Sequence, residues 1–220
     1  MAHNLIQRLL AEFIGTAGIV ATVTGAGHMA TSLGADSTVG LMMIAFAVGA
    51  VLFGAITMLG PISGAHFNPA VTIVMGLKKR ISATEGSIYI SVQILGGIGG
   101  AIIANLMFDK SWVSANTTVR AVSGGLLGEV VATYGLVLLI LLLAHHNLGS
   151  LIGAGVGTWI IAGHFFTSST SFANPAVTIG RAFTDAITGI ELASVAPFIG
   201  MQLVGALLAL GTFTVLTKNK

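Results

Sequence analysis

The chain has 220 residues, of which 55% are hydrophobic and only 7% are charged, against about 25% charged residues in an ordinary soluble domain. The formal net charge is only +2 and cysteine is absent, which argues against a nucleic-acid surface, a disulfide framework and a thiolate metal site. We therefore expect a membrane-embedded protein with no nucleic-acid partner, no metal and no cofactor.

Six apolar runs are long enough to cross a membrane as helices, because about 20 helical residues span a hydrocarbon core of ~30 Å. In chain order they cover residues 5–28, 39–60, 84–108, 121–145, 149–167 and 192–216. The first run is longer than most signal-peptide cores, and Glu12 interrupts it near its start. We interpret it as the first membrane span.

Two further apolar segments, 68–77 and 174–183, are too short to cross, since about ten helical residues rise only ~15 Å. Each begins with the same hexapeptide, Asn-Pro-Ala-Val-Thr-Ile, at 68–73 and again at 174–179. Asn is a preferred helix N-cap and Pro is favoured at the first helical position. The repeat therefore predicts two re-entrant half-helices that enter the membrane and stop midway.

The two halves of the chain resemble each other beyond the hexapeptide. Glu12 of the first span corresponds to Glu129 of the fourth, and Gln93 of the third span corresponds to Gln202 of the sixth. Each half contains three spans, an odd number, so the second half must be inverted relative to the first. We predict a single channel domain of two inverted repeats, about 1–110 and 119–220, an arrangement typical of transport proteins.

Basic residues are concentrated on one side of this topology, which predicts its orientation. Most of them lie at the chain termini or in the connection after the first half-helix: Arg8, Lys78, Lys79, Arg80, Lys218 and Lys220. Because cytoplasmic loops are enriched in Lys and Arg, both termini are expected in the cytoplasm.

Residues 63–72, Ser-Gly-Ala-His-Phe-Asn-Pro-Ala-Val-Thr, resemble the first Asn-Pro-Ala (NPA) box of the major intrinsic protein family, the aquaporins and aquaglyceroporins. The second box and the paired glutamates match as well, so the resemblance covers the whole chain. It implies an all-α membrane protein with six transmembrane helices and two half-helices, a pore through each subunit, and a homotetramer in the plasma (bacterial inner) membrane. The pore residues that it implies are Asn68, Pro69, Ala70, Asn174, Pro175 and Ala176.

Two opposed half-helices would bring two N-termini, each carrying about half a positive charge, to the centre of the pore. With their oxygens engaged in capping, Asn68 and Asn174 can donate amide hydrogen bonds to a passing solute. Neutral molecules would pass, whereas cations would meet a positive potential.

Members of the family normally carry Arg directly after the second NPA box, at the narrowest part of the pore, but this chain has Val177 there. Counting from the boxes, the resemblance implies Val48, Ser171 and Ala162 as the other filter residues. A loop two residues shorter would place His164, or its neighbour Gly163, at the position given to Ala162, so that assignment stays open.

A filter of small, uncharged residues predicts a pore wider than a water filter. The nearest cation, Arg181, lies one helical turn beyond Val177; it could share the same face, but we expect it to point elsewhere. The change from Arg to Val resembles aquaglyceroporins associated with bacterial arsenic-resistance operons. We therefore expect a passive channel for neutral solutes, among them glycerol, urea and the trihydroxy form of As(III), together with water.

Glu12 and Glu129 are the ionisable residues well inside predicted spans, and two roles are open for them. They could couple proton movement to solute transport, or they could accept hydrogen bonds from the backbone leading into each box, which the resemblance supports. His66 is expected to hold the backbone that leads into the first box.

The alternative functions are a plain water or glycerol channel, a proton-coupled secondary transporter and a non-conducting junction protein. No set of residues suggests an enzyme.

Overall fold

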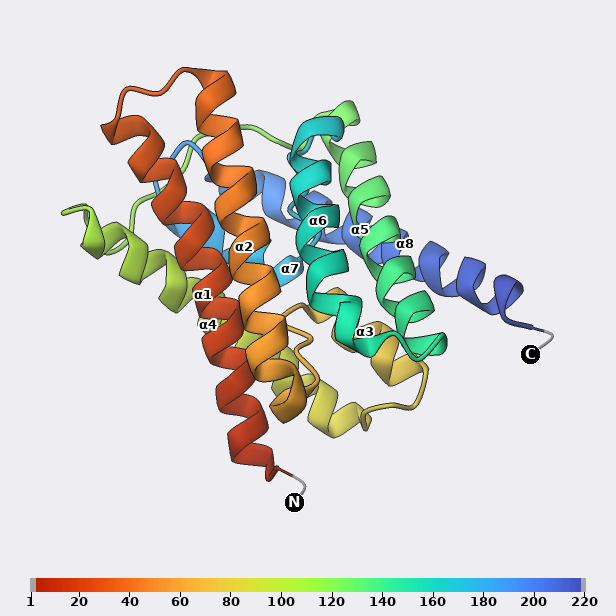
Figure 1. The fold of residues 1–220 in the computed structure, drawn as a ribbon. Helices are drawn as coiled ribbons and strands as arrows, with labels where there is room; N and C mark the ends of the chain where they lie inside the picture. The colour runs from red at the N-terminus through yellow and green to blue at the C-terminus, as the bar shows by residue number, and fades with distance from the viewer. Residues whose placement is uncertain (1–2, 219–220) are drawn as a thin grey trace.

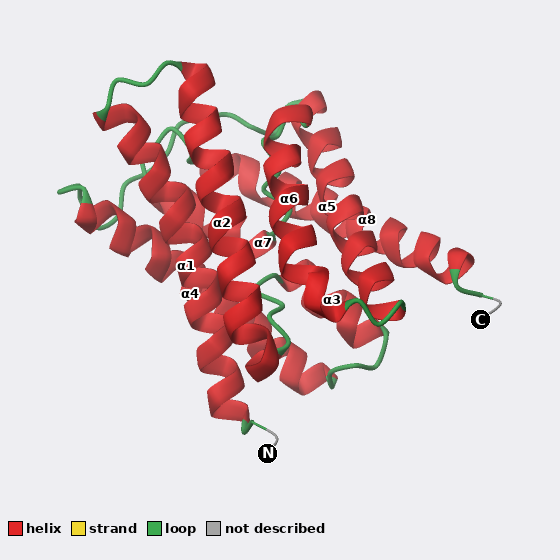
Figure 2. Ribbon diagram, in the orientation of Figure 1, coloured by secondary structure: helices red, strands yellow, loops and turns green. Residues whose placement is uncertain are grey.

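The computed structural model describes residues 3–218, and every regular element in this part of the chain is a helix (Figure 2). The elements are α1 (Leu5–Ser32), α2 (Ser37–Ser63), α3 (Pro69–Leu77), α4 (Ala83–Met107), α5 (Ser123–His145), η1 (Gly149–Leu151), α6 (Ile152–Phe166), α7 (Pro175–Gly180), η2 (Arg181–Phe183) and α8 (Leu192–Leu216). Six of these segments are long and apolar enough to cross a membrane, which confirms the six predicted spans. Lys220, counted above for the orientation, lies outside the described residues.

The first two spans are longer than predicted. Helix α1 continues to Ser32, and α2 extends beyond its predicted bounds at both ends. The Asp36 side chain accepts hydrogen bonds from the backbone amides of Thr38 and Val39, so α2 begins at Ser37. The second span was predicted to end at residue 60, but α2 continues through Pro61 to Ser63. Pro61 lies inside the helix, where it removes one backbone donor. The chain leaves the helix at Gly64, whose φ of 88° is a left-handed conformation that glycine adopts easily.

The long helices form two groups around the short ones. Helix α1 packs against α2 and α4, and α5 packs against α6 and α8, while α2 and α6 join the groups. In Figure 1, α1 and α2 lie on the left, α5 and α6 on the right, and α4 and α8 cross behind them. The short helices α3 and α7 touch each other and both contact α4 and α8. They therefore lie inside the bundle and not on its surface.

Glycines in α4 bring its backbone against two other helices. A Cβ atom built on Gly97 would lie 2.6 Å from the carbonyl oxygen of Ala176 in α7, and one on Gly180 would lie 2.6 Å from the carbonyl oxygen of Gly97. A Cβ on Gly96 would lie 2.6 Å from the carbonyl oxygen of Phe13 in α1. Small residues permit such close backbone contact between membrane helices. The close contact of Gly97 with Ala176 and Gly180 holds α7 in the interior.

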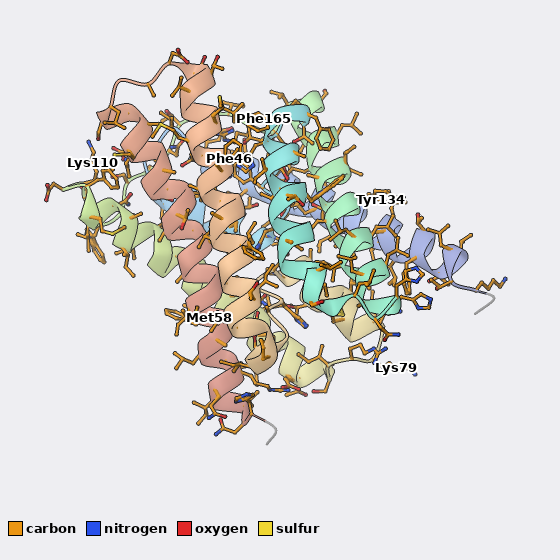
Figure 3. The ribbon with its side chains drawn as sticks, in the orientation of Figure 1. Phe46, Met58, Lys79, Lys110, Tyr134 and Phe165 are labelled. Carbon is orange, nitrogen blue, oxygen red and sulfur yellow. The ribbon has the colours of Figure 1, made fainter. Side chains whose placement is uncertain are left out.

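Large apolar side chains cover the outer surface. Phe46 of α2 and Phe165 of α6 lie side by side, with ring centroids 6.5 Å apart, and both are about half exposed (Figure 3). Met58 of α2 is also exposed. An extended apolar surface of this kind is unusual for a soluble protein and fits contact with lipid.

Candidate functional site

Both Asn-Pro pairs begin a short helix. Asn68 is the N-cap of α3, and its side-chain oxygen accepts a hydrogen bond from the Ala70 amide at 2.9 Å. Asn174 caps α7 in the same way. Pro69 and Pro175 occupy the first helical positions, where proline sacrifices no hydrogen bond. The half-helices therefore begin where the two pairs stand.

The two boxes meet in space although more than 100 residues separate them in sequence. The Asn68 amide nitrogen donates to the carbonyl oxygen of Ala173 at 2.8 Å, and the Asn174 amide nitrogen donates to the carbonyl oxygen of Phe67, also at 2.8 Å. An Asn amide has two donors, so each side chain keeps one N–H for another partner. The crossed pair of hydrogen bonds sets the N-termini of α3 and α7 against each other.

The segments that lead into the boxes have unusual backbone conformations. The first and third residues before each Asn have positive φ angles of 49° to 51°: Ala65, Phe67, Ser171 and Ala173. Left-handed conformations are uncommon for residues other than glycine and persist only where the surroundings enforce them. Both segments therefore need strong partners in the interior.

Glu12 of α1 is the partner of the first segment. One carboxylate oxygen accepts hydrogen bonds from the hydroxyl of Ser63 at 2.6 Å and from the backbone amide of His66 at 3.0 Å. The other accepts from the amide of Phe67 at 2.6 Å and from the side chain of Gln93 at 2.8 Å. Glu12 is fully buried, so these donors replace the water that the carboxyl group loses.

Glu129 of α5 holds the second segment in the same manner. Its two carboxylate oxygens accept hydrogen bonds from the backbone amides of Phe172 and Ala173, each at 2.9 Å. The Gln202 side chain donates to Glu129 and also to the hydroxyl of Thr178. Like Glu12, Glu129 is fully buried. Each box thus has its own glutamate and glutamine.

His66 lies in the segment before the first box, and its ring makes contacts in addition to the hydrogen bond of its backbone amide with Glu12. Its Nδ1 lies 3.1 Å from the hydroxyl of Thr72 in α3, and its ring packs edge-on against Tyr89 of α4, with centroids 5.5 Å apart. Thr72 also receives a hydrogen bond from Gln93 at 2.9 Å. His66 therefore links the loop to α3 and α4.

A cavity of about 270 Å³ passes beside the meeting point of the boxes. Asn68 and Asn174 both line it, whereas the Pro and Ala residues of the two boxes lie behind them and do not. Aliphatic side chains from α1, α2, α5 and α6 form most of the remaining wall, among them Ile19, Val23, Leu52, Leu136, Val156 and Ile160. The cavity is therefore apolar along most of its wall and polar at a few defined places.

Three of the four predicted filter residues line this cavity, and one does not. Val48, Ser171 and Val177 are buried and form part of the wall. Ala162 is exposed on the outside of α6, so its assignment is wrong; His164 lines the cavity in its place. Two residues along a helix turn the side chain by about 200°, to the opposite face. The cavity wall therefore includes an imidazole, and not small residues alone, among the residues considered for the filter.

Arg181 also lines the cavity, contrary to the expectation that it points elsewhere. Its side chain is buried, its Nε donates to the carbonyl oxygen of Thr188 at 2.5 Å, and its guanidinium carbon lies 3.3 Å from the centroid of the Phe172 ring. Arg181 comes four positions after Val177, a step that leaves the two side chains about 40° apart around a helix. The two side chains therefore share one face, and the cavity wall contains a cation.

The sequence showed the Gln93 and Gln202 pair only as a similarity between the halves and assigned it no role. The hydroxyls of Thr72 and Thr178, to which the glutamines donate, each donate in turn to the carbonyl oxygen of the capping Asn. Both threonines belong to the repeated hexapeptide. Two polar residues at equivalent places in two apolar spans were the available signal, because such residues usually face the bundle interior.

Described proteins are similar in sequence to this chain over nearly all of its length. The sequence profile described as "Major intrinsic protein" matches residues 1–173. "Aquaglyceroporin AqpS" of Rhizobium meliloti (strain 1021) is 41% identical over 208 residues, which are 94% of this chain and 88% of that protein. "Probable aquaporin NIP4-2" of Arabidopsis thaliana is 31% identical over 204 residues, or 90% of this chain and 71% of that protein.

A solved structure has the same fold. The aquaglyceroporin from Plasmodium falciparum superposes with a TM-score of 0.78 over 98% of both chains, at 19% sequence identity. At that identity the similarity shows the fold alone; the sequence matches carry the assignment. This chain belongs to the major intrinsic protein family, whose members are membrane channels for water and small solutes and not enzymes.

Proposed function

We propose that this protein is a passive channel for small uncharged hydroxylated solutes: glycerol and the neutral trihydroxy form of As(III), together with water. The observation that carries the proposal is Val177 in the wall of the cavity, where the family resemblance leads one to expect arginine. Valine is shorter and has no hydrogen-bond donor or charge. A passage that is wider at this residue admits solutes larger than water, because pore diameter and lining groups determine selectivity. The relative AqpS is named an aquaglyceroporin, which supports a glycerol-sized solute.

The two Asn residues provide one polar step on a mostly apolar path. Each keeps one amide N–H after the crossed hydrogen bonds have formed, and both side chains line the cavity. A solute hydroxyl can accept from these donors as it sheds water. The N-terminal end of α3 contributes a positive potential that disfavours cations at the same place.

A proton-coupled transporter would need titratable groups on the path. Glu12 and Glu129 do not line the cavity, and their carboxylate oxygens are occupied by backbone and side-chain donors. These contacts support structural roles for both residues and argue against either carboxylate as a proton-coupling group.

The arrangement of the whole protein in the membrane is part of the proposal. The two halves, about 1–110 and 119–220, would be inverted repeats, as the equivalent hydrogen bonds of Glu12 and Glu129 suggest. Both termini would be cytoplasmic, in the plasma (inner) membrane. By resemblance to the family, four copies would assemble as a homotetramer with one pore in each subunit.

Stopped-flow light scattering on proteoliposomes tests the proposed function. We expect water, glycerol and urea permeabilities to exceed those of empty vesicles, and uptake of As(III) at neutral pH to rise in proportion to its gradient. None of these solute fluxes should respond to an imposed pH gradient. Saturable uptake driven by a proton gradient would identify a coupled transporter instead. Water flux without glycerol flux would indicate a narrow water pore, and no flux of any solute would leave only a structural role.

A further inference from the structure

Three polar side chains line the cavity in addition to the Asn pair and His66. His164 comes from α6, Ser171 from the segment before the second box, and Arg181 from the turn that continues α7. All three are more than nine-tenths buried, with exposed fractions of 4%, 3% and 3%. Polar groups at this depth need partners, because desolvation without a hydrogen bond is costly. The protein supplies them only in part.

Arg181 is held rigidly but keeps unused donors. The Phe172 ring beneath the guanidinium and the Thr188 carbonyl at Nε fix the plane of the group. Within residues 3–218 the two terminal nitrogens of Arg181 have no hydrogen-bond acceptor, and the one salt bridge joins Arg8 to Glu85. The guanidinium therefore presents its free donors, and a charge without an ion-pair partner among residues 3–218, at the cavity wall.

The other two residues complement these donors. The hydroxyl of Ser171 is buried and has no hydrogen-bond partner within the described chain. His164 Nδ1 lies 2.8 Å from the carbonyl oxygen of Ile160, which can only accept. Nδ1 must therefore carry a proton, and Nε2 of the neutral ring is left as an acceptor. Together the three residues offer donors, a hydroxyl and an acceptor, a set suited to a molecule that carries several hydroxyl groups.

We infer that Arg181 is the specificity-determining cation of this pore: positioned by Phe172 and Thr188, it replaces the arginine missing at residue 177 from a place one helical turn farther from the boxes. His164 and Ser171 complete a polar site for the hydroxyl groups of an uncharged solute. Because the side chain of Val177 is short, it does not cover Arg181, and the guanidinium can face the cavity. This inference rests on the proposed function and adds to it the residue that rejects cations.

The test compares Arg181→Gln with Arg181→Lys in proteoliposomes that contain a pH-sensitive dye and are assayed for both proton and K⁺ flux. Glutamine removes the charge, so cation leak should rise about tenfold or more; lysine keeps the charge and should keep the leak near the wild-type level. Arg120→Gln is the matched control. Arg120 also lies against the Phe172 ring, with its guanidinium carbon 5.2 Å from the centroid, but it does not line the cavity. The Arg120→Gln substitution should leave cation exclusion unchanged.

A second arginine position distinguishes the electrostatic role from a structural one. In the double variant Val177→Arg with Arg181→Gln, the guanidinium returns to the site usual in the family, and cation exclusion should be restored. Cation exclusion that survives in folded Arg181→Gln, or a leak of equal size in Arg120→Gln, would overturn the inference. If Arg181→Gln does not fold, Ser171→Asp places a carboxylate on the same wall and should raise cation leak; an unchanged leak would also overturn it.

The same vesicles separate this inference from the proposed function. If wild-type protein passes no glycerol, the proposed function fails whatever the variants do. If wild-type protein passes glycerol and Arg181→Gln still excludes cations, only the role of Arg181 fails.

Discussion

Replacing Val177 with arginine is expected to lower glycerol permeability about tenfold or more while water permeability stays within about threefold of wild type. Val177 is buried in the cavity wall beside Asn174, so a longer side chain there must narrow the passage. A tenfold effect requires only ~1.4 kcal/mol of added barrier. Stopped-flow measurements of both solutes on one vesicle preparation give the ratio directly, and retained water flux shows that the variant is folded.

Val177→Leu is the matched control for this substitution. Leucine adds bulk without charge or donors, so it should reduce glycerol flux less than arginine does. Equal glycerol permeability in wild type and Val177→Arg would mean that residue 177 does not limit the pore, and the wide-filter assignment would then be wrong.

Removing the carboxylate of Glu12 should have the largest effect on stability. Glu12→Ala removes the acceptor of the backbone amides of His66 and Phe67, of the Ser63 hydroxyl and of one of the two Gln93 side-chain hydrogen bonds. Each unsatisfied buried group costs about 1–3 kcal/mol, so the sum is comparable with a total stability of about 5–15 kcal/mol. We expect little folded protein after detergent extraction, measured by size-exclusion chromatography and by the thermal unfolding midpoint.

Two further variants separate loss of the acceptor from loss of charge. Glu12→Gln keeps the shape and one carbonyl oxygen, so it should destabilise less than Glu12→Ala. Glu85→Ala removes a partly exposed carboxylate that pairs with Arg8 and should change stability little, because surface ion pairs contribute about 0–1 kcal/mol. A Glu12→Ala protein as stable as wild type would show that the first loop holds its left-handed conformation without the carboxylate.

Much of the fold could be predicted because its physical cause is local. A membrane span needs a certain length of apolar chain, and a half-helix is too short to cross; both properties are visible in a single sequence. Asn and Pro mark the start of α3 and α7 for equally local reasons. The end of α2 was predicted less well: the second span was expected to end at residue 60, whereas the helix continues through Pro61 and ends at Ser63.

The cavity wall depends on distances along the chain that no local pattern determines. Ala162 was assigned by counting back from Asn174, and this count assumed the length of the loop between α6 and α7. Because α6 continues to Phe166, His164 takes the inner face and Ala162 the outer one. Arg181 was misjudged for a related reason: its direction depends on Phe172 and Thr188, which become its neighbours only in the folded chain.

The central claim is that neutral solutes pass through the cavity beside Val177, and the absence of cysteine from the sequence allows a direct test. Val177→Cys carries a single thiol, and an uncharged methanethiosulfonate reagent should cut its glycerol flux about tenfold or more, reversibly with reductant. The same reagent should not affect wild type, nor Ala162→Cys, whose thiol would lie on the outer face of α6. Undiminished glycerol flux through Val177→Cys after complete labelling, verified by mass spectrometry, would contradict the claim that this cavity is the pathway.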